Sequence, residues 1–435
     1  MPLRRVLTTG DAAWLVAGNM IGAGIFFTPG DVARQLPGTL GPLAAWILGG
    51  ALALAGAAIY GELGARLPHA GGDYQYLTRA FGPLWGFLMG WAAFVLSFSA
   101  AAAAMSRVAV GYLVVLVSGA EQHTLLLERT VGPALLIGLT LLNVAGAKVG
   151  GRTTTILTSI PLLALAGIAA YGLLLGEARF DWPSRVLAPP SGSWPLALGA
   201  AMVPVFFTYS GWNGAAYLAG ELERPERTLP RALLLGTAGV TALYLGVNVL
   251  LLGLLGDGLA ASTTPGADAV RRLLPGRGEG VLPLIVAVAI ASSANVTLMA
   301  GARIYYAMAG ERLAPRALAR VNRRGVPATA LWCAGIWSAA LAALAPAGTL
   351  IRWATLAILL LSSLTVAALF VLRRRDPTFR SFRCPGYPVT PAVYLVASLG
   401  VAVSSALYDP WGALWGLLLV GAGFPVYALW RATER

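Results

Sequence analysis

The sequence predicts an all-α membrane protein with twelve transmembrane helices, and three observations support this. The 435-residue chain is 57% hydrophobic and only 11% charged, whereas a soluble domain carries roughly 25% charged residues. Apolar segments close to the roughly 20 residues needed to cross a bilayer recur along the whole chain. Glycine-rich stretches interrupt the first and the sixth of these segments. We therefore expect one transmembrane domain over residues 1–435.

The expected spans follow one another through short loops, which favours a compact bundle. They cover residues 11–35, 40–64, 82–117, 130–147, 154–175, 194–219, 230–255, 280–308, 327–345, 348–372, 389–407 and 411–430. The apolar run after the first ten residues is too long for a cleavable signal peptide, so the first span is expected to remain as an anchor.

The first interruption lies at residues 18–26, which read Gly-Asn-Met-Ile-Gly-Ala-Gly-Ile-Phe. Glycine weakens a helix by about 1 kcal/mol relative to alanine. A broken helix in a bilayer leaves backbone groups unpaired, which is tolerated only beside protein or a polar cavity. The stretch therefore predicts a solute site at membrane depth. The alternative is that these glycines allow close helix packing.

A second interruption lies at residues 206–214, in the sixth segment. The first and sixth segments begin two sets of five, so the two breaks occupy corresponding positions, as in transporters built from inverted repeats. Because five is odd, the two sets would have opposite topology. We expect one repeat over residues 11–175, a second over 194–372, and two extra helices over 389–430.

The two breaks together offer the chemistry of a zwitterion site. A half-helix that begins at a break presents free N–H groups and a positive dipole end, which suit a carboxylate. Carbonyl groups at the ends of the preceding half-helices suit an ammonium group, so an α-amino acid is the simplest solute. The candidate substrate-binding residues are Ile21, Gly22, Ala23, Gly24, Ile25, Phe207, Thr208, Ser210 and Gly211.

Aromatic and hydroxyl side chains add two further candidates. Phe207 and Trp212 flank the second break and could gate an apolar pocket, although membrane aromatics also serve in packing and interfacial belts. Ser292 and Ser293 in the eighth segment could ligate Na⁺ together with carbonyls of the first break, or they could pack between helices. The coupling ion is expected to be Na⁺ or H⁺, and no cofactor is expected.

Charged residues are scarce within the spans. Glu62, Arg107, Glu221 and Arg303 are functional candidates by default, but each lies near a helix end, where snorkelling or a structural ion pair explains it equally well. No carboxylate is placed near either break, which argues for a neutral substrate. A cationic amino acid or a polyamine is the alternative if Glu62 or Glu221 lies nearer the site.

The distribution of basic residues predicts the topology. With the N-terminus inside, 21 of the 31 basic residues fall on the inner side and 8 on the outer side, which fits the positive-inside rule with both termini cytoplasmic. We expect a multi-pass protein in the lipid bilayer of a prokaryotic cytoplasmic membrane. The net charge of +13 is therefore not interpreted as nucleic-acid binding.

Other classes of function find little support in the sequence. Two cysteines and two histidines, widely scattered, predict no metal site, and no nucleophile–base constellation predicts an enzyme or any catalytic residue. An ion channel also uses backbone carbonyls at helix breaks, but no repeated filter motif is present. A receptor that binds an amino acid without moving it is the remaining rival.

Several motifs resemble those of the amino acid–polyamine–organocation (APC) superfamily, close to the bacterial relatives of its L-type amino acid transporter branch. They are residues 18–26, 59–68, 70–74, 80–83, 207–213, 223–232 and 303–309. The resemblance implies a LeuT-like five-plus-five inverted repeat with two extra helices, in which helices one and six are unwound and bind the amino acid's backbone. It also implies that an aromatic residue at Phe207 acts as an outer gate.

Two departures from the superfamily pattern limit what the resemblance implies. Many members carry a lysine within helix five that replaces or exchanges a coupling ion, but the corresponding position here is Thr158 or Pro161. Coupling through a lysine is therefore not expected, and Thr158 joins the candidates for ion coupling. The loop at residues 118–129 contains no cysteine, so we expect no disulfide-linked heavy subunit.

Overall fold

The computed structural model describes residues 3–118, 124–174, 189, 192–274 and 280–433. Within these residues every regular element is a helix, and the only β contact is an isolated bridge between Leu7 and Leu222. The predicted all-α class is confirmed for this part of the chain. The cysteine-free loop expected at 118–129 includes residues 119–123, which lie outside the described residues.

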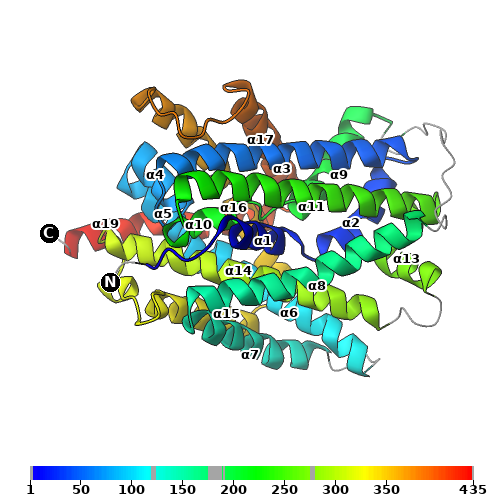
Figure 1. The fold of residues 1–435 in the computed structure, drawn as a ribbon, viewed down its shortest axis with the longest axis horizontal. Coiled ribbons are helices and arrows are strands. Elements are labelled where there is room, and N and C mark those ends of the chain that lie inside the picture. Colours follow the sequence, from blue (N-terminus) through cyan, green and yellow to red (C-terminus); the bar gives the residue numbers. More distant parts are fainter. Residues whose placement is uncertain (1–2, 119–123, 175–188, 190–191, 275–279, 434–435) are drawn as a thin grey trace.

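Long apolar helices run along the longest axis of the molecule (Figure 1). The longest are α3 (Leu40–Arg66), α8 (Ala147–Leu174), α11 (Pro225–Leu255), α14 (Val281–Gly310) and α16 (Ala347–Arg375). Helix α14 packs along α6, and α11 packs along α3. Small residues make such close contacts possible: a Cβ added at Gly50 of α3 would lie 2.4 Å from a side-chain atom of Thr241 of α11.

The remaining elements connect or complete these spans. They are α4 (Asp73–Phe81), α5 (Pro83–Ala92), the π-helix η1 (Ala93–Ser97), α6 (Phe98–Ser118), α7 (Thr124–Val144), α12 (Gly258–Ala261), α13 (Pro265–Leu273), η4 (Arg316–Ala319), α15 (Ala328–Leu344), α17 (Val389–Tyr408), α18 (Pro410–Gly421) and α19 (Gly423–Thr433). Within the described chain, nine helical stretches are long and apolar enough to cross a membrane, and α15 is apolar but shorter. The count of twelve spans stays a prediction.

Two stretches of the chain each consist of short helices joined across a break. Helices α1 (Thr9–Met20) and α2 (Gly24–Gln35) are bent by 50° relative to each other, and only together are they long and apolar enough to cross a membrane. Helix α9 (Trp194–Thr208) is followed by a turn and then by α10 (Gly214–Tyr217) and η3 (Ala219–Glu221). Both breaks coincide with the glycine-rich stretches singled out in the sequence.

Both chain ends lie at the same end of the bundle (Figure 1), which is the arrangement expected for an even number of crossings. Loops at this end are tied to one another through arginine side chains. Arg4 donates to the carbonyl of Arg323 at 3.1 Å, and Arg324 donates to the carbonyl of Ala145 at 3.2 Å. We call this end of the bundle, which also holds α4 and η3, the terminal end.

Candidate functional site

The first break exposes the amino end of α2. Ile21 is extended (φ −76°, ψ 98°) and ends α1 by donating its N–H to the carbonyl of Ala17 at 2.9 Å. No side chain caps α2, and the first N–H groups of a helix have no partner within it. Among the described residues, the N–H groups of Gly22, Ala23 and Gly24 make no hydrogen bond. The positive end of the α2 dipole is therefore free to receive an anionic group.

The second break is held against the first at Gly211. Gly211 has φ +97°, and a Cβ added there would lie 2.5 Å from the carbonyl oxygen of Asn19. Glycine is thus required both for the backbone conformation and for the close approach. The side-chain amide of Asn19 donates to the carbonyl of Gly211 at 2.8 Å, so the two breaks form one unit.

The carbonyl groups at the helix ends are held in place by hydroxyl groups. The Tyr244 hydroxyl donates to the carbonyl of Met20 at 2.8 Å and lies 3.5 Å from that of Thr208. The Ser210 hydroxyl donates to the carbonyl of Phe207 at 2.6 Å. A carbonyl oxygen has two lone pairs, so the Met20 and Thr208 oxygens each retain one for an ammonium group. The Phe207 oxygen also accepts the Ser210 N–H at 3.0 Å, so both of its lone pairs are used.

Asn19 and Tyr244 were not singled out from the sequence as site residues. Asn19 lies inside the first interruption, and that position was a sequence signal for a role in the site. Its hydrogen-bond partner Gly211 is 192 residues away along the chain, so the contact itself could not be predicted. Tyr244 is fully buried in the middle of an apolar helix, where a hydroxyl group needs a partner. That requirement was the only sequence signal for Tyr244.

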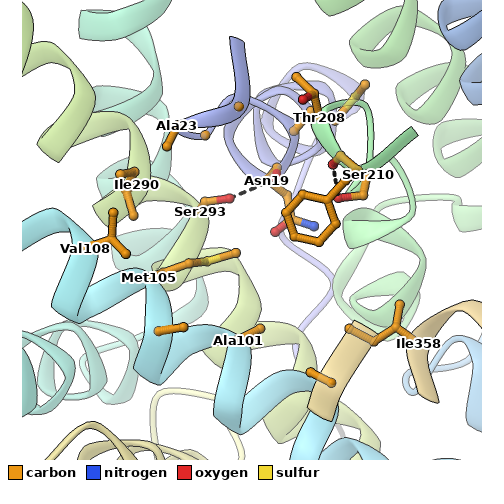
Figure 2. Close-up of a pocket in the computed structure, with 16 residues that line it drawn as sticks. Asn19, Ala23, Ala101, Met105, Val108, Thr208, Ser210, Ile290, Ser293 and Ile358 are labelled. Carbon is orange, nitrogen blue, oxygen red and sulfur yellow. Dashed lines mark hydrogen bonds between the residues drawn. The ribbon is translucent and has the colours of Figure 1, made fainter. Parts of the chain in front are cut away.

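A cavity of about 180 Å³ lies between the two breaks and helix α6 (Figure 2). Ala101, Met105 and Val108 line it from α6, and Ile290 and Ile358 line it from α14 and α16. Among the described residues that line it, none carries a charged side chain. The cavity therefore combines exposed backbone dipoles on one side with a small apolar wall on the other.

The predicted substrate-binding residues divide into three groups. Those that line the cavity are Gly22, Ala23, Gly24, Phe207, Thr208 and Ser210. Ile21 and Ile25 are buried at 1% and 0% exposure and pack in the core instead. Gly211 lines a second cavity of about 350 Å³ between α9, α16 and α17.

The two predicted gate residues have different surroundings. Phe207 is 53% exposed and lines both cavities. Trp212 lines only the second cavity and is 6% exposed, with its ring 4.8 Å from that of Tyr60 and 6.0 Å from that of Tyr394. Phe207 thus borders the 180 Å³ cavity at an exposed position, whereas Trp212 is packed between other aromatic rings. The gating role of both residues stays a prediction.

The three candidates for ion coupling, Thr158, Ser292 and Ser293, lie next to the last turn of α1. The hydroxyl oxygens of Thr158 and Ser292 are 2.7 Å apart, and both lie within 3 Å of a Cβ added at Gly18. Ser293 donates to the carbonyl of Asn19 at 2.8 Å and is the one of the three that lines the cavity (Figure 2). Within the described residues, no cluster of histidine, cysteine and acidic side chains could hold a metal ion.

The charged residues within the spans have ionic partners away from the cavity. Glu221 and Arg303 are both fully buried and pair at 2.6 Å. Glu62 pairs with Arg66 at 2.9 Å and also with Arg373, while Arg107 pairs with Glu128 at 3.2 Å. None of these groups is among the described residues that line the 180 Å³ cavity, so a cationic group bound there would find no counter-charge in them.

Comparison with known proteins identifies the family. The model of the family described as amino acid permease matches residues 7–424. The serine/threonine exchanger SteT of Bacillus subtilis is 29% identical, covering 96% of this chain and 94% of that protein. The Asc-type amino acid transporter 1 of Mus musculus is 30% identical, covering 100% of this chain and 83% of that protein. The human large neutral amino acids transporter small subunit 2 is 29% identical over 98% of this chain.

The predicted membership is therefore confirmed, and so is the expectation that the chain is not an enzyme. These relatives are transporters by name, and the described part of this chain has apolar helices long enough to cross a membrane. The chain belongs to the amino acid permease family of the APC superfamily.

Proposed function

We propose that this chain transports neutral L-amino acids across a prokaryotic cytoplasmic membrane by alternating access around the 180 Å³ cavity. The substrate carboxylate accepts hydrogen bonds from the N–H groups of residues 22–24. The ammonium group donates to carbonyls within residues 20–21 and 207–210, chiefly those of Met20 and Thr208, which retain a lone pair. The apolar wall of the cavity receives a small or medium side chain.

One observation carries this proposal. Free backbone N–H groups at the start of α2 and carbonyl oxygens at the ends of α1 and α9 line one cavity that has no charged side chain. Such a cavity can neutralise both poles of an α-amino acid but offers nothing to a charged side chain. The relatives, which by name exchange serine and threonine or transport neutral amino acids, support the same class of substrate.

Counterflow in proteoliposomes tests the proposal. Purified full-length protein is reconstituted with a high internal concentration of one amino acid, and uptake of trace label is measured for alanine, serine, leucine, phenylalanine, lysine, arginine and putrescine. We expect saturable uptake of the neutral amino acids and at least tenfold less for the cationic compounds. Uptake of lysine, arginine or putrescine at comparable rates would instead support the cationic alternative.

The same assay separates the other rivals. A channel would conduct without saturation and without stimulation by internal substrate, and a receptor would bind without counterflow. Repeating the assay with Na⁺ replaced by choline tests the coupling role proposed for Thr158, Ser292 and Ser293. An Na⁺ ion at this place would have to replace the hydrogen bond between Thr158 and Ser292.

Two further proposals concern the surroundings of the transporter. We propose that it functions without a disulfide-linked heavy subunit, because its two cysteines are a half-buried residue within α15 (Cys333) and a buried residue (Cys384). We also propose that both termini are cytoplasmic, because the predicted inner loops carry most of the basic residues.

A further inference from the structure

A buried carboxyl group outside the substrate cavity has no role in the proposed site. Asp73, the first residue of α4, is 2% exposed and lies at the terminal end of the bundle. Its Oδ2 atom accepts a hydrogen bond from the Tyr217 hydroxyl at 2.6 Å. Within the described chain, its Oδ1 atom has no hydrogen-bond partner. An ionised carboxylate in such a place is costly, so this arrangement favours the neutral form.

Four buried tyrosines surround this carboxyl group, and we call them the tyrosine cage: Tyr60 of α3, Tyr76 of α4, Tyr217 of α10 and Tyr394 of α17. Each is at most 2% exposed. The hydroxyls of Tyr60 and Tyr76 also lack a hydrogen-bond partner among the described residues. A protonated Asp73 could donate to such a hydroxyl group, which the ionised form cannot do.

No cation offsets the charge of an ionised Asp73 in the part of the chain that the structure describes. The charged side chains on the elements packed nearby have other partners: Glu62 pairs with Arg66 and Arg373, Arg303 pairs with Glu221, Arg375 donates to the carbonyl of Arg79, and Glu311 accepts from Tyr74. The first N–H groups of α4 donate to the carbonyls of Gly71 and Gly72, not to the Asp73 carboxyl group.

The tyrosine cage is directly connected to the second helix break. The side-chain amide of Asn213 donates to the Tyr217 hydroxyl at 3.2 Å, and Asn213 is the residue that precedes α10. The Gly71 N–H donates to the Tyr217 carbonyl at 3.0 Å, and a Cβ added at Gly72 would lie 2.6 Å from the Tyr217 ring. A movement of α10 that opened a path to the terminal end would therefore break the contacts of Asp73 and admit water to it.

We propose that Asp73 is a proton-binding site: the closed tyrosine cage holds a proton on this carboxyl group, and opening of the cage toward the terminal end releases it. This inference rests on the proposed alternating-access function, because it assigns the proton to one of the two states of that cycle. The proton binds to a carboxylate oxygen and returns to water, so no other reactant is needed.

The direction of the pH effect follows from the surroundings. Burial raises the pKa of Asp73 to about 6, although the hydrogen bond from the Tyr217 hydroxyl favours the ionised form and partly opposes this. In an open cage, water returns the pKa toward the ordinary value of about 4. Because the pKa is higher in the closed cage, closing takes up a proton. The closed cage is therefore stabilised as pH falls through about 6, and the gain is complete below about pH 4.

Cysteine labelling tests this inference without any amino acid present. Gln75 is 7% exposed on α4, so Gln75→Cys, in full-length protein with Cys333→Ala and Cys384→Ala, reports opening of the cage. Its rate of reaction with a methanethiosulfonate reagent is compared with the rate in the same protein carrying Asp73→Asn, which mimics the neutral carboxyl group. The ratio of the two rates cancels the intrinsic pH dependence of the thiol.

We expect the ratio to approach about a hundredfold at pH 8, to be about tenfold at pH 5 and to approach one only below about pH 4, because each of the two pKa units corresponds to tenfold in the equilibrium. A ratio that does not change with pH would overturn the inference. Tyr217→Phe removes a donor that favours the ionised form, so it should move the midpoint to higher pH, and an unmoved midpoint would also count against the site. If Asp73→Asn does not fold, the labelling rate of Gln75→Cys is compared directly with and without Tyr217→Phe, and the intrinsic pH dependence of the thiol cancels in that ratio as well.

Glu226→Gln is the matched control, because Glu226 is an exposed carboxylate in the first turn of α11, close after η3. It should leave the pH dependence of labelling unchanged, and a loss of that dependence in this variant would contradict the assignment to Asp73. Since labelling needs no substrate, a failed counterflow experiment and a failed labelling experiment identify different errors.

Discussion

Single glycines determine whether the two helix breaks can meet. Gly24 faces Thr208, and a Cβ added at Gly24 would lie 2.5 Å from the Thr208 hydroxyl oxygen. That hydroxyl cannot easily move, because it donates to the Pro204 carbonyl at 2.8 Å and lies 2.9 Å from the Thr28 hydroxyl. The space between α2 and α9 is therefore limited to a hydrogen atom at this position.

Replacing Gly24 with valine should abolish uptake while membrane expression stays normal. The added side chain must push the first turn of α2 away from α9 and move the N–H groups that bind the carboxylate. Uptake should fall by at least tenfold in the proteoliposome assay. Gly239→Val in α11 is the control, since nothing lies within 4 Å of a Cβ added there. Normal uptake by the Gly24 variant would count heavily against the site.

Tyr244→Phe should weaken substrate binding without unfolding the protein. Its hydroxyl joins the carbonyls of Met20 and Thr208, so its loss leaves the Met20 oxygen without this donor and frees the two helix ends to separate. A lost buried hydrogen bond costs about 1–3 kcal/mol, which corresponds to roughly a tenfold rise in the KM for exchange. Tyr305→Phe in α14, which loses a bond to the Ala93 carbonyl, should leave KM unchanged.

At the scale of elements, one ion pair fixes the end of the second broken span. Glu221 closes η3, and both of its carboxylate oxygens accept from the guanidinium group of Arg303 on α14, at 2.6 and 3.2 Å. The Glu221 carbonyl also accepts the N–H groups of Val6 and Leu7. The chain segment before α1 and the segment after α10 are thus held together at a single point.

Glu221→Gln should therefore destabilise the protein by about 3–5 kcal/mol, because it leaves the buried Arg303 without its counter-charge. The double variant Glu221→Leu/Arg303→Met should cost much less, since it removes both charges. Chemical denaturation in mild detergent provides the measurement. Asp31→Asn breaks an exposed pair with Arg34 and should cost at most about 1 kcal/mol. Equal losses for the single and double variants would show that the pair is not the source of the stability.

The positions of the breaks could be predicted from the sequence, but the contacts between them could not. Glycines within an apolar run disfavour a continuous helix wherever they occur, so residues 18–24 and 211–214 were visible as local signals. The pairing of Glu221 with Arg303 joins residues 82 positions apart, and nothing local specifies it. Trp212 illustrates the same limit: proximity to the break suggested a gate, whereas its packing against Tyr60 depends on the tertiary fold.

At the scale of the whole molecule, the loops predicted to be cytoplasmic lie together. Arg66 of α3 donates to the Asp376 carbonyl at 2.9 Å, and Asn322 donates to the Val144 carbonyl at 3.1 Å, so loops far apart in sequence meet at the terminal end. At the opposite end Arg34 donates to the Ala260 carbonyl at 3.2 Å. Hydropathy and charge could predict which loops lie at which end of the bundle. Each helix that crosses the bundle places the loops before and after it at opposite ends.

Reporter fusions test the orientation that this sorting implies. Green fluorescent protein fused to either terminus should fluoresce in a bacterial host, and alkaline phosphatase fused after Arg435 should be inactive, because the positive-inside rule places the arginine-rich end in the cytoplasm. Alkaline phosphatase fused after Gly258, in the segment that contacts Arg34 at the opposite end through Ala260, should be active. An active C-terminal phosphatase fusion would show that the orientation is the opposite one, and Asp73 would then bind its proton from outside the cell.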